Sequence, residues 1–161
     1  MNKKVVCLVF GIFLSLVSFF SFDNYVKADI DGLTVTPLIG DSDVTDRFQI
    51  IGDSNSERTL EISLSNFGIR RLHLKVVPTN ATTSMDGKIV YTDDVKAGQY
   101  GLKYAFSDMT KSQKVTLAPN KTKDLKFKVK LPSKKINGLV LGGFSIRSLD
   151  SAVSGTADVP V

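Results

Sequence analysis

The chain has 161 residues, a formal net charge of +5, 42% hydrophobic residues and 23% charged residues. That length leaves room for one ordinary domain. Because both fractions are those of globular proteins, the composition excludes intrinsic disorder over the whole chain.

The first 28 residues have the pattern of a secretory signal peptide. Lys3 and Lys4 precede an uncharged, largely apolar run over residues 5–20, and Val26 and Ala28 place small side chains where signal peptidase accepts them. We therefore predict cleavage after Ala28 and no membrane span in the mature chain. An uncleaved anchor is the alternative, but a spanning helix needs about 20 apolar residues.

The single cysteine, Cys7, lies near the start of this apolar run. A lipoprotein signal has its cysteine at the end of the run, so lipidation is not predicted. After cleavage the chain has no cysteine, which fits export by a bacterium and excludes thiol catalysis and cysteine metal sites.

Charge is unevenly distributed after the signal peptide. Residues 29–95 include 6 basic and 11 acidic residues, whereas residues 96–147 include 12 basic and 2 acidic residues. A basic surface of this kind suits an anionic partner. For a secreted protein, a wall polymer with phosphates or carboxylates fits better than nucleic acid. Simple solvation of charged strand faces is the alternative.

Short strand patterns follow one another along the chain, and none keeps a 3.6-residue apolar repeat for long. They cover residues 33–38, 48–51, 60–65, 72–76, 89–91, 102–106, 115–117, 125–131 and 139–146. The strands at 60–65 and 72–76 are predicted to pair as a hairpin. Residues 106–109 are predicted to form a short helical turn capped by Ser107 or Asp108.

The clearest strand covers residues 125–131, where four apolar residues alternate with Lys126, Lys128 and Lys130. One face of this strand therefore lies on a core. Gly142 and Gly143, in the following strand, predict a bulge or a close backbone approach. If six or seven of these patterns are strands at roughly ten-residue spacing, they predict an all-β fold, an immunoglobulin-like antiparallel β-sandwich that follows the signal peptide.

Five segments in order resemble the peptidoglycan-binding domain of the WxL-interacting protein family of Firmicutes. They are LTVTPL (33–38), LEISLSN (60–66), VVPTNATTSMDGKIVYT (76–92), LKYAFSDM (102–109) and VTLAPNKTKDLKFKVKLPSKKINGLVLGG (115–143). Each fragment alone is weak evidence for the resemblance, since alternating strands are common. The occurrence of all five in the same order is specific. The resemblance covers residues 29–149.

The resemblance implies a secreted, wall-associated protein that partners with WxL-domain surface proteins. Family members look like two immunoglobulin-like domains followed by a transmembrane helix, and the first domain is credited with binding peptidoglycan. We expect a signal peptide at 1–28, one such domain at 29–149 and a short linker-like tail at 150–161. Relative to the family plan, the chain is expected to be C-terminally truncated.

Catalytic chemistry is not predicted. His73 alternates with apolar neighbours and is expected to face solvent, and no nucleophile motif or phosphate loop occurs. Adjacent residues on a strand point to opposite faces, so Asp93 and Asp94 do not flank a substrate. The acidic group of Asp41, Asp43, Asp46 and Asp53 lacks the pattern of a calcium loop. We therefore expect no enzyme activity, no metal and no cofactor.

The candidate wall-binding residues are the lysine row, Lys126, Lys128 and Lys130, with Tyr91 and Tyr104 as flat surfaces for a sugar. The alternative is that the lysines protect an edge strand and that Tyr104 belongs to the core. The predicted function is a secreted, wall-associated module that binds peptidoglycan, or an anionic wall polymer, and helps to attach WxL-type surface proteins. The alternative is a protein-interaction module that docks a partner by strand addition.

Overall fold

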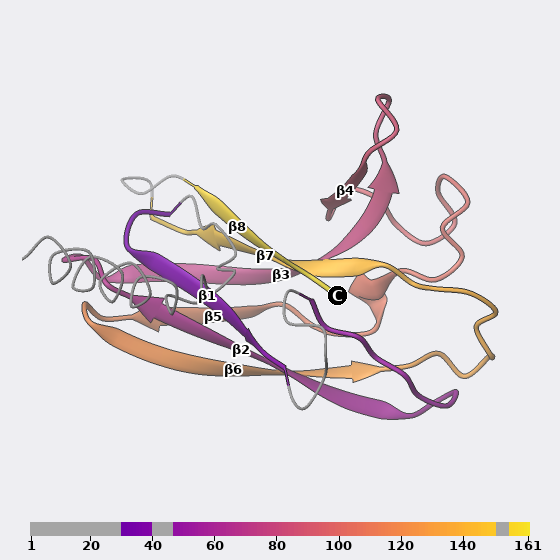
Figure 1. Cartoon of the computed structure of the whole chain (residues 1–161), viewed down its shortest axis with the longest axis horizontal. Coiled ribbons are helices and arrows are strands. Elements are labelled where there is room, and N and C mark those ends of the chain that lie inside the picture. The colour runs from indigo at the N-terminus through magenta and orange to yellow at the C-terminus, as the bar shows by residue number, and fades with distance from the viewer. Residues whose placement is uncertain (1–29, 40–46, 151–154) are drawn as a thin grey trace, which may run out of the picture.

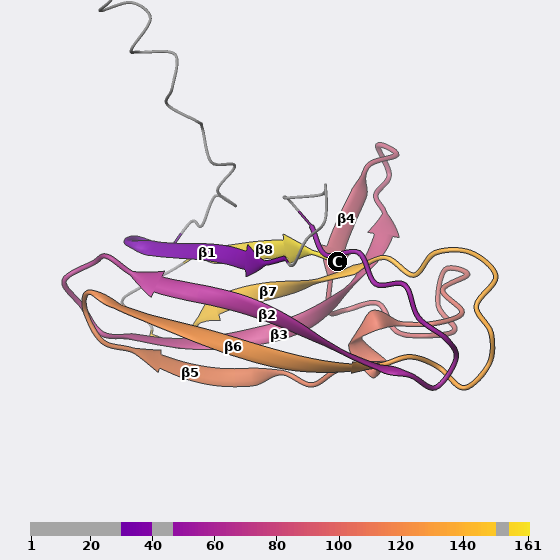
Figure 2. The same cartoon turned by 60° about the horizontal axis from the view of Figure 1, so that its bottom comes forward.

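The computed structural model describes residues 30–39, 47–150 and 155–161. These residues form two antiparallel β-sheets packed face to face (Figures 1 and 2). The predicted all-β antiparallel sandwich is thus confirmed. The predicted signal peptide, its cleavage site at Ala28, and three aspartates of the acidic group (residues 41, 43 and 46) lie outside the described residues. Within those residues, no helix is long and apolar enough to cross a membrane.

The smaller sheet has three strands in the order β1-β2-β6. They are β1 (Leu33–Leu38), β2 (Glu57–Asn66) and β6 (Lys121–Lys130). From Leu60 onward in β2 and from Leu125 onward in β6, every second residue is buried, which is the period of a strand with one face on a core. The opposite face of β6 carries the lysine row.

The larger sheet is organised around β3 (Leu72–Thr83). Its first half pairs with β5 (Gln113–Leu117), and its far end pairs on the same side with β4 (Ile89–Thr92). On its other side β3 pairs with β7 (Gly142–Ser148), which in turn pairs with β8 (Thr156–Pro160). Because β3 is long, it pairs with three neighbouring strands, β4, β5 and β7.

The predicted hairpin between the 60–65 and 72–76 strands is wrong, because β2 and β3 belong to different sheets. Both strands bury leucines at alternate positions, so the two buried faces meet across the core. The turn between them is held by Asn66, whose Nδ2 donates to the backbone oxygens of Arg70 at 2.7 Å and Leu117 at 3.3 Å. Its Oδ1 accepts from the Gly68 N–H at 2.9 Å.

Three other segments differ from their sequence patterns. Residues 48–51 form no strand, although Phe48 is buried and its N–H donates to the Pro160 oxygen at 3.3 Å. Residues 102–105 are irregular and lead into a 3₁₀ turn, η2 (Phe106–Asp108), which has no side-chain cap. The segment expected to be a linker-like tail includes β8, because Ala157 and Val159 alternate into the core.

The core includes an aromatic cluster at the end of the sandwich that carries η2. The ring of Phe144 lies 4.3 Å from that of Phe127 and 5.4 Å, edge-on, from that of Phe106, measured between centroids. Gly142 permits this packing, since a Cβ there would lie 2.3 Å from the Phe106 Cβ. The prediction that these glycines allow a close approach is confirmed.

The outer face of β7 carries a bidentate ion pair between Arg147 and Asp93, with N–O distances of 2.7 and 3.1 Å. This hydrogen bonding by Arg147 holds the pKa of the Asp93 carboxyl below its ordinary value of 3.8. The folded carboxyl therefore binds a proton less readily than the unfolded one. The pair's contribution to stability is complete well above pH 3.8 and is lost as the pH falls below that value.

This pair predicts a specific acid sensitivity. The urea midpoint of unfolding is expected to fall between pH 5 and pH 2.5, and to fall less steeply in the Asp93→Asn variant. Urea unfolding curves of both proteins, recorded at closely spaced pH values, give the slope of the urea midpoint against pH for each. Identical slopes in the two proteins would show that this carboxyl contributes nothing to the pH dependence.

Candidate functional site

The candidate site lies at the η2 end of the sandwich, where the segment before η2 meets the segment between β6 and β7. Asn80, on β3, fixes this corner: its Nδ2 donates to the Val95 oxygen and to the Ser107 Oγ, both at 2.8 Å. Its Oδ1 accepts from the Ser107 N–H at 3.0 Å. The end of β6 is tied to the same corner, since the Lys130 N–H donates to the Met109 oxygen at 2.9 Å.

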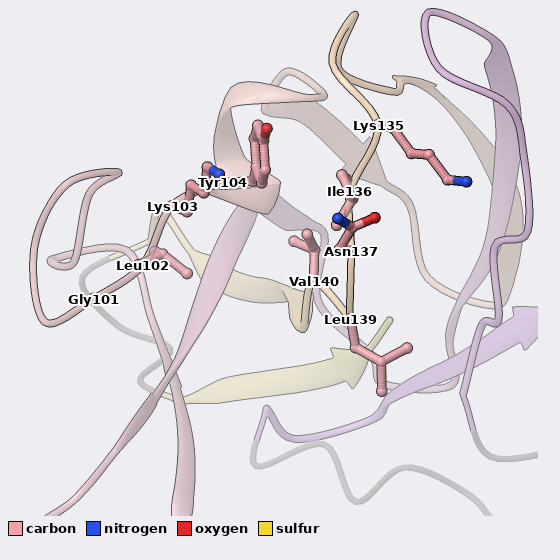
Figure 3. A pocket seen from close by; sticks show the side chains of 9 residues that line it. All are labelled: Gly101, Leu102, Lys103, Tyr104, Lys135, Ile136, Asn137, Leu139 and Val140. Carbon is pink, nitrogen blue, oxygen red and sulfur yellow. The ribbon is translucent and has the colours of Figure 1, made fainter.

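Tyr104 stands between two hollows at this corner. One hollow has a volume of about 240 Å³ and is lined by Lys103, Tyr104 and residues of the 135–140 segment, including Lys135, Ile136 and Asn137. Figure 3 shows Lys103 and Tyr104 on one side of this hollow and that segment on the other. The second hollow, of about 400 Å³, is lined by Lys103, Tyr104, Asp108 and Lys130, among others.

The corner combines an aromatic ring with several cations. The Lys103 Nζ lies 5.6 Å from the centroid of the Tyr104 ring, within cation–π range. Lys135 and Lys130 line the first and second hollows respectively. A half-buried ring of this kind can stack against a sugar, and lysines beside it can meet carboxylates or phosphates. The arrangement fits an uncharged sugar joined to an anionic group.

The predicted lysine row is only partly available to a ligand. The Lys126 Nζ lies 2.9 Å from the Glu61 carboxylate, whose hydrogen bond raises the pKa of Lys126, and the Lys128 Nζ lies 3.3 Å from Glu57. Both glutamates come from β2, which pairs with β6. Among the described residues, Lys130 has no ion pair. The structure therefore groups Lys130 with Tyr104 and leaves Lys126 and Lys128 on an ion-paired strand face.

Tyr91 lies apart from both hollows, on β4. Its Cδ1 lies 3.4 Å from the position that a Cβ on Gly143 would occupy, so its ring packs over the outer face of the larger sheet. The structure thus brings together Tyr104 and Lys130 and does not add Tyr91 to them.

Sequence patterns alone did not single out Lys103 and Asn137 as site residues. They come from irregular segments, where no period of two or 3.6 shows which way a side chain points. The one available signal was composition, because lysines, asparagine and glycine cluster in the segment after Pro132.

His73 is exposed, as expected, and has a structural contact. Its Nδ1 lies 2.8 Å from one oxygen of Asp150, and its backbone N–H donates to the other oxygen at 2.9 Å. These bonds lower the pKa of Asp150 and fasten the segment after β7 to β3. The pair lies outside both hollows.

The fold is a β-sandwich with two hollows at one corner. The chain belongs to the family described as WxL Interacting Protein, peptidoglycan binding domain, whose sequence profile matches residues 33–148. The expected resemblance is thereby confirmed. Among curated proteins, none matches the chain.

Proposed function

We propose that the protein is a secreted, wall-associated binding module that holds peptidoglycan at the Tyr104 corner and helps to attach a WxL-type surface protein. The observation that supports this most directly is the position of Tyr104 between two hollows with Lys103, Lys130 and Lys135 around it. The family description supports the same ligand class.

Each part of the corner has a counterpart in a wall polymer. Peptidoglycan joins sugars, which stack on aromatic rings, to peptide stems that carry carboxylates. Tyr104 would receive a sugar ring, while the lysines would contact a stem carboxylate. An exposed lysine contact of this kind contributes about 1 kcal/mol or less, so the ring is expected to dominate.

Tyr104→Ala is expected to weaken binding to insoluble peptidoglycan about tenfold, and Lys130→Gln about twofold to fivefold, because the ring provides the larger contact. Lys126→Gln is the matched control and should change binding least, since Lys126 already contacts Glu61. Co-sedimentation with peptidoglycan stripped of attached polymers measures all three. Unchanged sedimentation of a folded Tyr104→Ala variant would contradict the site.

The same assay decides whether the lysines or the ring carry the binding. Lysine contacts weaken as salt rises, whereas stacking on the ring changes little. Sedimentation that persists in high salt with stripped wall supports the ring. A folded protein that stays in the supernatant under every condition would leave the alternative, a module that binds only proteins.

A further inference from the structure

The hairpin made by the end of β3 and by β4 extends away from the body of the sandwich (Figures 1 and 2). Among the described residues, β4 is an edge strand of the larger sheet. Its apolar side chains are unusually accessible: Ile89 is 57% exposed and Val90 is 39% exposed. Met85, in the hairpin turn, is fully exposed.

The hydrogen bonds of the hairpin show which backbone groups face the open edge. The Ala81 N–H donates to the Leu141 oxygen, on the β7 side of β3, so Ala81 and its partner Tyr91 do not bond each other. In an antiparallel ladder the bonded and unbonded pairs alternate. Ile89 and Tyr91 therefore direct their N–H and C=O groups outward, and no other described residue bonds them.

The remaining edge strands are protected. In β8, Asp158 and Pro160 occupy outward positions, and the Pro160 oxygen is bonded by the Phe48 N–H. In β1, Pro37 removes an outward N–H. β6 and β5 present lysines at their edges, including Lys114. Charge and proline are the usual means of preventing strand addition.

β4 lacks both kinds of protection, since its sequence, IVYT, has no charged residue and no proline. Sheets normally avoid a free, apolar edge of this kind unless it is used. A free edge specifies its occupant more narrowly than an apolar face does. Water can bond the outward backbone groups when the edge is free, and an extended backbone is the protein partner whose N–H and C=O groups match their spacing.

We propose that the open edge of β4 receives an extended segment of a partner protein. The segment adds as an antiparallel strand, is uncharged and apolar at alternate positions opposite Ile89–Thr92, and places a basic side chain at Asp94. Asp94 is exposed and has no salt bridge among the described residues, so the charge complements the site. The idea that this edge helps to attach a surface protein rests on the proposed function. The prediction that the edge accepts an added strand does not.

A second copy of this chain fits the edge less well. The antiparallel register that uses Ile89 and Tyr91 of both copies would bring Asp86 of one beside Asp94 of the other. Two four-residue strands also bury much less than the roughly 1,000 Å² expected of a stable interface. A longer, basic partner segment avoids both problems.

The test uses a capped hexapeptide, arginine followed by alternating valine and threonine, added at millimolar concentration to the purified protein. Backbone amide exchange at Ile89 and Tyr91, followed by NMR, is expected to slow at least tenfold. The same peptide with alternate N-methyl groups cannot form the ladder and should have no effect. Absence of protection by the unmodified peptide would overturn the proposal.

Ile89→Pro removes one outward N–H at the first position of an edge strand, where proline is tolerated, and should abolish the protection at Tyr91. Ile89→Lys keeps the backbone, adds a protecting charge and should weaken the effect several-fold. Val90→Thr, which changes an inward-bonded position, is the matched control and should retain protection. Protection that survives both Ile89 variants would overturn the proposal.

Two further readouts separate this inference from its alternatives. Peptidoglycan sedimentation should be unchanged by Ile89→Pro, so failure of wall binding and failure of strand addition are distinguishable. Sedimentation equilibrium should show a monomer. A dimer that is lost in the Ile89→Pro variant would assign the edge to a second copy and overturn the partner proposal.

Discussion

Replacement of Phe144 by alanine is expected to lower the free energy of unfolding by about 3–5 kcal/mol. Phe144 is fully buried, with 0% of its side chain exposed, and its ring contacts Phe127 from the opposite sheet and Phe106 from the η2 turn. The loss combines the transfer of an aromatic ring with a cavity that the two flanking rings cannot fill. Urea unfolding followed by circular dichroism measures the change.

The matched control is Phe67→Ala, in the turn between β2 and β3. Phe67 is 68% exposed, so its removal is expected to change the free energy of unfolding by about 0.5 kcal/mol or less. Equal effects of the two variants would show that the aromatic cluster does not join the two sheets as the geometry indicates.

Asn80→Ala is expected to destabilise the protein by about 2–4 kcal/mol, because it leaves the Val95 carbonyl and the Ser107 N–H without their side-chain partner. Asn80 has 0% of its side chain exposed, so water replaces these bonds poorly. The loss should also loosen the segment that carries Tyr104. Peptidoglycan binding is therefore expected to weaken even under conditions where the variant remains folded.

Asn66→Ala separates the two effects. Asn66 is about as deeply buried and also makes three side-chain hydrogen bonds, all to backbone groups, but it lies at the opposite end of the sandwich. Its loss should reduce stability by a similar amount and leave wall binding intact. If both variants lost wall binding equally at matched folded fractions, Asn80 would have no special role in placing Tyr104.

The strands with regular alternation were the predictable part of the fold. The pattern of residues 125–131 correctly assigned the buried and exposed faces of β6. Strand pairing was harder to predict. The alternation of apolar residues shows which side chains enter the core, but it does not show which strands are neighbours in a sheet. The turn after β2 could close a hairpin or cross to the other sheet, and the side-chain bonds of Asn66 belong to a crossing that only the folded chain displays.

The candidate site was predictable only in part for a similar reason. Tyr104 and Lys130 could be named from residue type and position. That Lys126 and Lys128 would be ion-paired depends on the register that sets β6 against β2, which is far away in sequence. No local pattern around either lysine carries that information. Lys103 and Lys135 line the same hollow only because two irregular segments converge.

The central place of β3 has a consequence for how the chain folds. Its partner β7 comes long after it in the sequence, and Val76 must find Ile146 before the larger sheet can close. Pairings between such distant residues require a large loop entropy to be lost before contacts compensate for it. We therefore expect the chain to fold slowly, on the order of milliseconds to seconds, and to leave the 89–92 edge without a partner strand while β7 is still unpaired.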